Sequence, residues 1–206
     1  LGLTPPADLA KALQDGRQRF GLDAYHAALA ALPDEMRAEL DRAHGPAAND
    51  PAVRDGAFEF AALALGPTVV ALQPERGDAA GREDEYHDLA RVPRHGYVAF
   101  YLWLRQRVRA MVHIGAHGTL EWLPGKAVAL SDTCWPEALL GDLPVIYPFI
   151  VNDPGEAAQA KRRIGAVTIG HVSPPLKDSG TPERLARLEA LLDEFSNADG
   201  LDPRRR

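Results

Sequence analysis

Two histidines and a glutamate occur close together in one glycine-containing stretch of the sequence. They are His113, His117 and Glu121, and the stretch ends at Lys126. Two imidazoles and a carboxylate suit a divalent transition metal. The stretch therefore predicts a functional site, with His113 and His117 as metal ligands.

Two familiar motifs that use similar residues do not match this stretch. A zinc-protease helix places His-Glu-x-x-His on one continuous helix, whereas Gly115 and Gly118 interrupt the spacing here. A phosphate-binding P-loop would need glycine at Leu120 and serine or threonine at Ala127. The sequence therefore predicts neither a zinc protease nor an ATP site.

The elements around the stretch are expected to bring its side chains to one edge of a sheet. Residues 111–114 predict a short buried strand that delivers His113 to its carboxyl end, and the glycines that follow predict a sharp turn. Residues 119–122 predict a single helical turn that carries Glu121. In open α/β sheets, ligands bind at the carboxyl ends of the strands.

The whole chain is expected to adopt an α/β fold, rich in helices, with short buried strands and a β-hairpin. We expect a helical segment at 1–55, an α/β region at 56–200 and a tail at 201–206. Within these we expect the following elements: helices over 6–44, a hairpin of 58–65 and 68–72, a buried aromatic helix at 96–107, a strand at 144–150, a helix from 153, a helix rather than a strand at 166–172, and a last helix from 181.

The composition excludes several classes of protein. The 206 residues carry a net charge of −6 without a basic stripe, so nucleic-acid binding is not expected. No stretch approaches the roughly 18–20 apolar residues of a membrane span, and residues 1–11 do not resemble a signal peptide. Cys134 is the single cysteine, so no intrachain disulfide is possible, which fits a reducing cytoplasm. Cys134 itself is expected to be a small buried hydrophobic residue. The absence of an initiator methionine favours a longer parent protein.

The run from His113 to Lys126 resembles the signature of the large subunits of class I chelatases. These subunits insert cobalt into corrins or magnesium into protoporphyrin. Further blocks follow in the family's order, so that the resemblance covers about residues 20–200. The blocks are 69–77, 93–97, 131–136, 147–156, 161–163 and 174–175.

Two of these blocks favour the cobalt branch of the family. They are the run Glu-Trp-Leu-Pro-Gly-Lys at 121–126 and the run at 147–156. The magnesium branch would more typically carry Phe-Met at 122–123 and further aromatic residues at 148–149. The resemblance thus implies a ligase that forms nitrogen–metal bonds, with Co²⁺ and the corrin precursor hydrogenobyrinic acid a,c-diamide as substrates in cobalamin biosynthesis.

The resemblance also implies partners, and the types of residue present suggest a role for each at such a site. Separate AAA+ subunits would bind and hydrolyse ATP, and this chain would be part of a larger multidomain subunit. Glu121 would accept a proton from the ring, while His113 and His117 hold the metal or face the macrocycle. The residues expected to bind the substrate are His95, Lys126, Arg162 and Arg163, the last three by pairing with its peripheral carboxylates.

Two other functions remain open at this point. A metal-dependent hydrolase on an α/β scaffold would use the same His113, His117 and Glu121, and would bind metal tightly without a tetrapyrrole. A non-catalytic segment that only docks partner subunits would bind no pigment.

Overall fold

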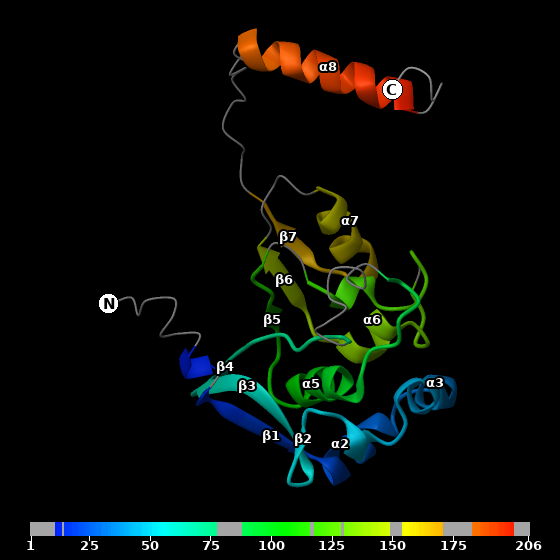
Figure 1. The fold of residues 1–206 in the computed structure, drawn as a ribbon. Coiled ribbons are helices and arrows are strands. Elements are labelled where there is room, and N and C mark those ends of the chain that lie inside the picture. The colour runs from blue at the N-terminus through cyan, green and yellow to red at the C-terminus, as the bar shows by residue number, and fades with distance from the viewer. Residues whose placement is uncertain are drawn as a thin grey trace. The chain divides into compact units, whose positions relative to one another are not determined.

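The structure is a computed structural model that describes residues 11–13, 15–77, 88–115, 118–128, 130–148, 154–170 and 183–199. The chain divides into two compact units, residues 1–171 and residues 172–206. The first unit contains two sheets and several helices, and the described part of the second is one helix, α8 (Glu183–Asp199). The predicted mixed α/β class is confirmed (Figure 1).

An antiparallel sheet is built around one long strand, β3. All three other strands pair with it: β1 (Arg17–Gly21), β2 (Val53–Arg54) and β4 (Thr68–Ala71) all lie against β3 (Ala57–Leu65). Alternate residues of β3, namely Phe58, Phe60 and Ala62, are buried, as expected for a strand with one face on a core. The predicted hairpin is confirmed, because Leu65 of β3 is paired with Thr68 of β4.

The helix α5 (His95–Arg105) forms the centre of the core. Every residue from His95 to Leu104 is buried, as is typical of a helix surrounded by other elements. It packs against β3, α2 (Leu22–Leu29) and α6 (Trp135–Leu140) (Figure 1). The ring of Phe60 on β3 lies 5.4 Å from that of Phe100 and 5.2 Å from that of Trp103. The predicted buried aromatic helix is confirmed.

A second sheet, parallel and made of very short strands, positions the glycine-containing stretch. It has the order β5 (Met111–Val112), β6 (Val145–Pro148), β7 (Val167–Ile169). Other elements in the described part of this unit are α3 (Asp34–His44), the 3₁₀ turns η1 (Ala47–Asn49) and η3 (Leu120–Trp122), and α7 (Pro154–Arg163). The strands predicted at 111–114 and 144–150 and the helical turn at 119–122 are therefore present. β5 is shorter than expected, and residues 149–150 lie outside the described ranges.

Two secondary-structure predictions were wrong. Residues 17–21, expected to be helical, form strand β1 and pair with β3. Residues 167–169, for which a helix was favoured, form strand β7. Gly165, with φ of +58°, follows the end of α7, and the β-branched side chains of Val167, Thr168 and Ile169 suit a strand that pairs with β6.

None of the helices in the described ranges is long and apolar enough to cross a membrane.

Candidate functional site

The carboxyl group of Glu121 is enclosed by the protein. Glu121 lies on η3 and is 1% exposed. Its Oε1 accepts a hydrogen bond from the backbone N–H of Gly118 at 3.1 Å and from the hydroxyl of Tyr147 at 3.3 Å. Tyr147 belongs to β6, so the turn and the parallel sheet together fix the direction of this carboxylate.

The imidazole of His113 lies beside the same carboxylate. His113 follows β5 directly, and its backbone N–H donates to the carbonyl oxygen of Ile146 on β6 at 2.9 Å. Its ring meets the ring of Tyr147 edge to face, with 4.7 Å between centroids. The parallel pairing of β5 with β6 therefore places His113 and Tyr147 next to each other, as predicted for the carboxyl ends of neighbouring strands.

Gly118 lies between the imidazole and the carboxylate. A Cβ atom at this position would be 2.8 Å from Nε2 of His113 and 3.1 Å from Oε2 of Glu121. Both functional atoms thus lie within 3.1 Å of one point, and only a residue without a side chain fits between them. Oε1 holds the two hydrogen bonds described above, so Oε2 is the oxygen on the side of His113.

The surroundings of Glu121 make its carboxylate a stronger base than usual. Burial raises the pKa of Glu121 above its ordinary value, hydrogen bonds from Gly118 and Tyr147 oppose this, and the negative charge of Glu156 adds to the increase. Glu156 lies on α7, is 8% exposed, and accepts a hydrogen bond from Nε1 of Trp122 at 2.8 Å. Buried carboxyl groups with a raised pKa are suited to acid–base chemistry.

The three cations predicted to bind substrate have different environments. The side chains of Lys126 and Arg162 are exposed, so they are accessible to a ligand. Arg163 is 1% exposed, and its guanidinium donates to the backbone oxygen of Glu121 at 2.7 Å and to that of Lys126 at 3.1 Å. The guanidinium of Arg163 is therefore bonded to the backbone of residues 121 and 126 and is not exposed to a ligand.

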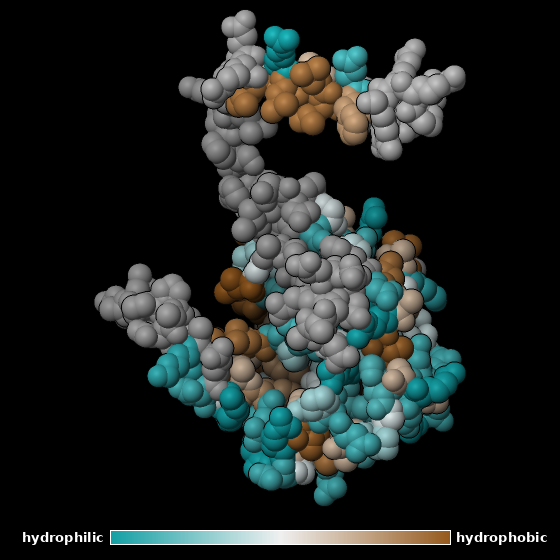
Figure 2. Space-filling view, in the orientation of Figure 1, coloured by the Kyte–Doolittle hydropathy of each residue, from teal (hydrophilic) through white to brown (hydrophobic). Residues whose placement is uncertain are grey.

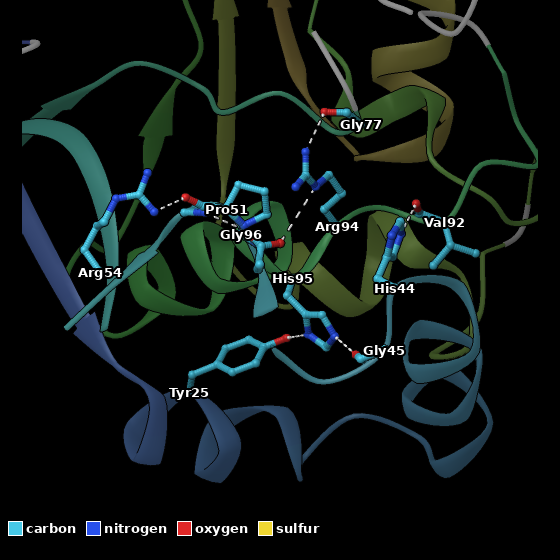
Figure 3. Close-up of polar contacts among 12 residues, drawn as sticks. Tyr25, His44, Gly45, Pro51, Arg54, Gly77, Val92, Arg94, His95 and Gly96 are labelled. Atoms are coloured by element: carbon cyan, nitrogen blue, oxygen red, sulfur yellow. Dashed lines mark hydrogen bonds and ion pairs between the residues drawn. The ribbon is translucent and has the colours of Figure 1, made fainter. Parts of the chain in front are cut away.

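His95 lies apart from this group and has partners on both ring nitrogens. Its Nδ1 lies 2.7 Å from the hydroxyl of Tyr25, and its Nε2 lies 2.8 Å from the carbonyl oxygen of Gly45. Both contacts are drawn in Figure 3. A carbonyl only accepts, so Nε2 carries the proton and Nδ1 accepts from Tyr25. Burial lowers the pKa of His95, which favours this neutral form. Substrate contact through His95 would require one of these bonds to break.

The position of helix α5, on which His95 lies, is fixed by Asp50. Oδ2 of Asp50 accepts from the backbone N–H of Gly96 at 3.0 Å, while Oδ1 accepts from that of Ala52 at 2.8 Å. Arg94 lies 3.8 Å from Oδ2, and its side chain reaches the carbonyl of Gly77 (Figure 3). A carboxylate at the N-terminus of a helix is favourable. The contacts of Asp50 therefore stabilise the position of α5.

A groove of about 270 Å³, lined mostly by apolar residues, has His113 in its wall. It runs between β4 and β5, and the residues that line it include Leu72, Tyr101, Val112 and Ile114. Several of these are solvent-exposed: Leu72 by 45%, Val112 by 55% and Ile114 by 83%. Figure 2 shows apolar side chains gathered on this face, over β4 and β5. Exposed apolar surface beside a polar site is typical of a ligand-binding face.

The predicted metal site is described only in part. His117 lies outside the described residues. Within the described ranges, no three His, Cys, Asp or Glu side chains form a group that could hold a metal ion. His113 and Glu121 are brought together as predicted, whereas the metal-binding role of His113 with His117 stays a prediction.

Two residues near the carboxylate were missed from the sequence. Tyr147 and Glu156 both fall in the block at 147–156 that carried part of the resemblance, but neither was predicted to be at the site. The signal for Tyr147 was positional, because Tyr147 lies near the carboxyl end of a second buried strand, which pairs in parallel with β5. Parallel strands that pair bring their ends to a common edge.

The sequence matches the protein family described as CobN/Magnesium Chelatase over residues 6–206. It is 53% identical over 190 residues to the aerobic cobaltochelatase subunit CobN of Pseudomonas aeruginosa, covering 91% of this chain and 15% of that protein. A protein of the same name from Sinorhizobium sp is 48% identical over 202 residues, which is 97% of this chain and 16% of the relative. A magnesium-chelatase subunit of Chlorobaculum parvum is 39% identical over 135 residues, 65% of this chain and 11% of the relative.

A solved structure has a similar fold. The catalytic subunit of cobaltochelatase from Mycobacterium tuberculosis matches with a TM-score of 0.71 and 41% sequence identity, over 96% of this chain and 18% of that one. The chain therefore spans less than a fifth of the length of these relatives.

Proposed function

The chain belongs to the CobN/magnesium chelatase family, and on that premise we propose that it forms part of the metal-insertion site of a cobaltochelatase large subunit. The cobalt branch is favoured by similarity, since the two cobaltochelatase relatives are 53% and 48% identical over more than nine-tenths of the chain. The magnesium-chelatase relative is 39% identical over 65% of it.

The proposed reaction places Co²⁺ in a corrin ring during cobalamin biosynthesis. The substrates are Co²⁺ and hydrogenobyrinic acid a,c-diamide, and separate AAA+ subunits hydrolyse the ATP that drives the reaction. Metal insertion requires that the incoming ion lose water and that ring N–H groups lose their protons. The protein must therefore supply metal ligands, a base and a surface for the macrocycle.

One observation carries this proposal: a buried carboxylate with a raised pKa lies beside an imidazole at the carboxyl edge of the parallel sheet. Glu121 accepts a ring proton on Oε2, the oxygen on the side of His113. Oε1 stays bound to the N–H of Gly118 and the hydroxyl of Tyr147, so the carboxylate does not rotate during the transfer. His113, with His117, binds the metal or faces the macrocycle, since imidazoles suit Co²⁺.

The groove beside His113 is the surface on which we expect the macrocycle to bind. Its exposed apolar side chains, Leu72, Val112 and Ile114, suit the flat face of a ring system. The side chains of Lys126 and Arg162 are exposed cations that pair with the peripheral carboxylates of the ring. Because the chain as a whole carries a net charge of −6, these local cations act against an unfavourable overall field.

The role of Glu121 is tested by Glu121→Gln in the assembled chelatase. General-base catalysis contributes roughly 10²- to 10⁴-fold to a rate, so the cobalt insertion rate should fall by about that factor while the pigment still binds. Glu137→Gln is the matched control, because Glu137 lies on α6 with an exposed side chain. A Glu121→Gln enzyme that folds, binds pigment and inserts cobalt at the wild-type rate would refute the role.

Pigment binding separates this function from a metal-dependent hydrolase. We would titrate the chain with hydrogenobyrinic acid a,c-diamide and follow absorbance and fluorescence quenching, with wild type beside His117→Ala. Saturable binding weakened by the substitution supports the chelatase. Tight metal binding with hydrolysis of a small ester, and no effect of pigment, would favour a hydrolase instead.

A further inference from the structure

A single buried arginine binds both ends of the segment that carries Glu121. Arg163 ends α7 and is 1% exposed. Its Nη1 donates to the backbone oxygen of Glu121 at 2.7 Å, and its Nε donates to that of Lys126 at 3.1 Å. One planar guanidinium thus joins the first and last residues of the 121–126 segment.

This segment has little regular structure of its own. The 3₁₀ turn η3 consists of three residues, and it is followed by Leu123 in an extended conformation and by Gly125 with φ of +146°. So short a turn is a weak support for a buried carboxylate. The position of Glu121 therefore depends on the elements that pack against the segment.

Helix α7 supplies two of these supports. Besides the bonds of Arg163, Glu156 accepts a hydrogen bond from Nε1 of Trp122, the residue after Glu121. The backbone carbonyl oxygen of Trp122 accepts a hydrogen bond from Nη1 of Arg76 at 2.9 Å. Among these partners, Arg163 is the one that bonds to Glu121 itself.

Burying Arg163 here carries a cost that its two hydrogen bonds only partly offset. A buried guanidinium loses its hydration. In addition, Nη2 of Arg163 has no hydrogen-bond acceptor within the described part of the chain, and an unsatisfied buried donor is unfavourable. Lysine would not reproduce the arrangement, because a point-like ammonium lacks the planar fork that meets two separate carbonyls.

We infer that Arg163 is a positioning residue for metal insertion, which fixes the backbone of the 121–126 segment so that Oε2 of Glu121 is on the side of His113. The inference rests on the proposed role of Glu121. It gives Arg163 a different task from the substrate contact expected from the sequence, and it leaves Lys126 and Arg162 as the cations available to substrate carboxylates. Arg163 itself touches no reacting atom.

The test is a double-mutant cycle in the assembled chelatase, with Arg163→Met, Glu121→Gln and the double variant. The cobalt insertion rate is measured per bound pigment molecule, so that unfolded protein is not counted. Because a misplacement of about 1 Å can cost roughly 10²-fold in rate, Arg163→Met should slow insertion by about that factor at an unchanged KM for pigment. Residues that act as a unit have non-additive effects, so the double variant should be no slower than Glu121→Gln alone.

Two further variants complete the design. Arg163→Lys keeps the charge and should lose about 10-fold, less than Arg163→Met, since one of the two carbonyl bonds remains possible. If the methionine variant does not fold, Arg163→Lys takes its place in the double-mutant cycle with Glu121→Gln. Lys161→Met is the matched control, because Lys161 lies on the same helix, two residues before Arg163, is exposed and has no assigned role in substrate binding. It should leave the insertion rate per bound pigment within about twofold of wild type, as most exposed substitutions are mild.

Each alternative result has a distinct meaning. A double variant slower than Glu121→Gln by the full factor of Arg163→Met would show that Arg163 acts independently, and would overturn the inference while the role of Glu121 stands. Glu121→Gln at the wild-type rate would overturn the proposed function and this inference with it. An Arg163→Met enzyme with normal insertion per bound pigment would overturn the inference alone.

Discussion

Replacing Gly118 by alanine tests the geometry of the site most directly. The new Cβ would lie 2.7 Å from Cε1 and 2.8 Å from Nε2 of His113, and 3.1 Å from Oε2 of Glu121. Distances below 3.0 Å are not tolerated, so the imidazole or the segment carrying Gly118 must move. The cause is lack of space, since Gly118 is not among the glycines with positive φ.

The size of the effect follows from this crowding. Overpacking a filled site costs typically about 1–3 kcal/mol, which for a chain of this length lowers Tm by roughly 2–12 °C. If His113 and Glu121 act together, a displacement of about 1 Å at either should also lower the cobalt insertion rate by roughly 10²-fold. The rate should therefore fall far more than the fraction of folded protein.

The measurement compares Gly118→Ala with Gly21→Ala by thermal unfolding and by insertion rate per bound pigment. Gly21 is the matched control, because a Cβ there meets nothing within 4 Å and its φ of −60° suits alanine. Gly21→Ala should match wild type in both assays. If Gly118→Ala were as stable and as active as Gly21→Ala, the close approach of His113 and Glu121 would not be the functional arrangement.

Three further predictions concern the buried polar groups. Burial raises the pKa of Glu121 above its ordinary value of 4.5, so its contribution to stability is complete below that pH and is lost as the pH rises through the raised pKa. Glu121→Gln, which mimics the protonated form, should thus be more stable than wild type at neutral pH and equal to it in acid, as urea titrations at several pH values would reveal. Glu156→Gln removes a negative charge that helps to raise the pKa of Glu121, so the acid limb of the insertion rate should move to lower pH; a shift to higher pH would contradict this. His95→Phe leaves the Tyr25 hydroxyl and the Gly45 carbonyl without their partner, and should cost about 1–3 kcal/mol of unfolding free energy for each, with insertion per folded molecule unchanged. Weaker pigment binding at unchanged stability would instead support the substrate contact predicted for His95.

Much of the scaffold was predictable because its signals are local. The hairpin was marked by two apolar runs separated by Gly66 and Pro67, and the central helix by its unbroken aromatic and apolar residues. The meeting of His113 with Glu121 followed from a strand that ends before a glycine turn. These elements needed no knowledge of distant partners.

The remaining features depend on contacts between distant parts of the chain. Residues 167–169 become a strand because β6 is available to pair with them, and a short apolar run does not reveal this by its own period. The burial of Arg163 was equally hidden, because Arg162 and Arg163 are adjacent and identical in type. Only the direction in which α7 faces the 121–126 segment makes one of them internal and leaves the other in solvent.

The short strands of the parallel sheet have a consequence for how the molecule moves. β5 pairs with β6 through two residues, and β7 pairs with β6 through three. By contrast, β3 is nine residues long and has partners along its whole length. Backbone amides open locally with free energies that follow the extent of such pairing. In hydrogen exchange, the amides around His113 and Ile146 should therefore exchange at a lower opening free energy than those of Phe58 and Phe60. The edge of the parallel sheet that carries the site can then rearrange around a ligand, while the hydrogen bonds of the antiparallel sheet and of α5 stay intact.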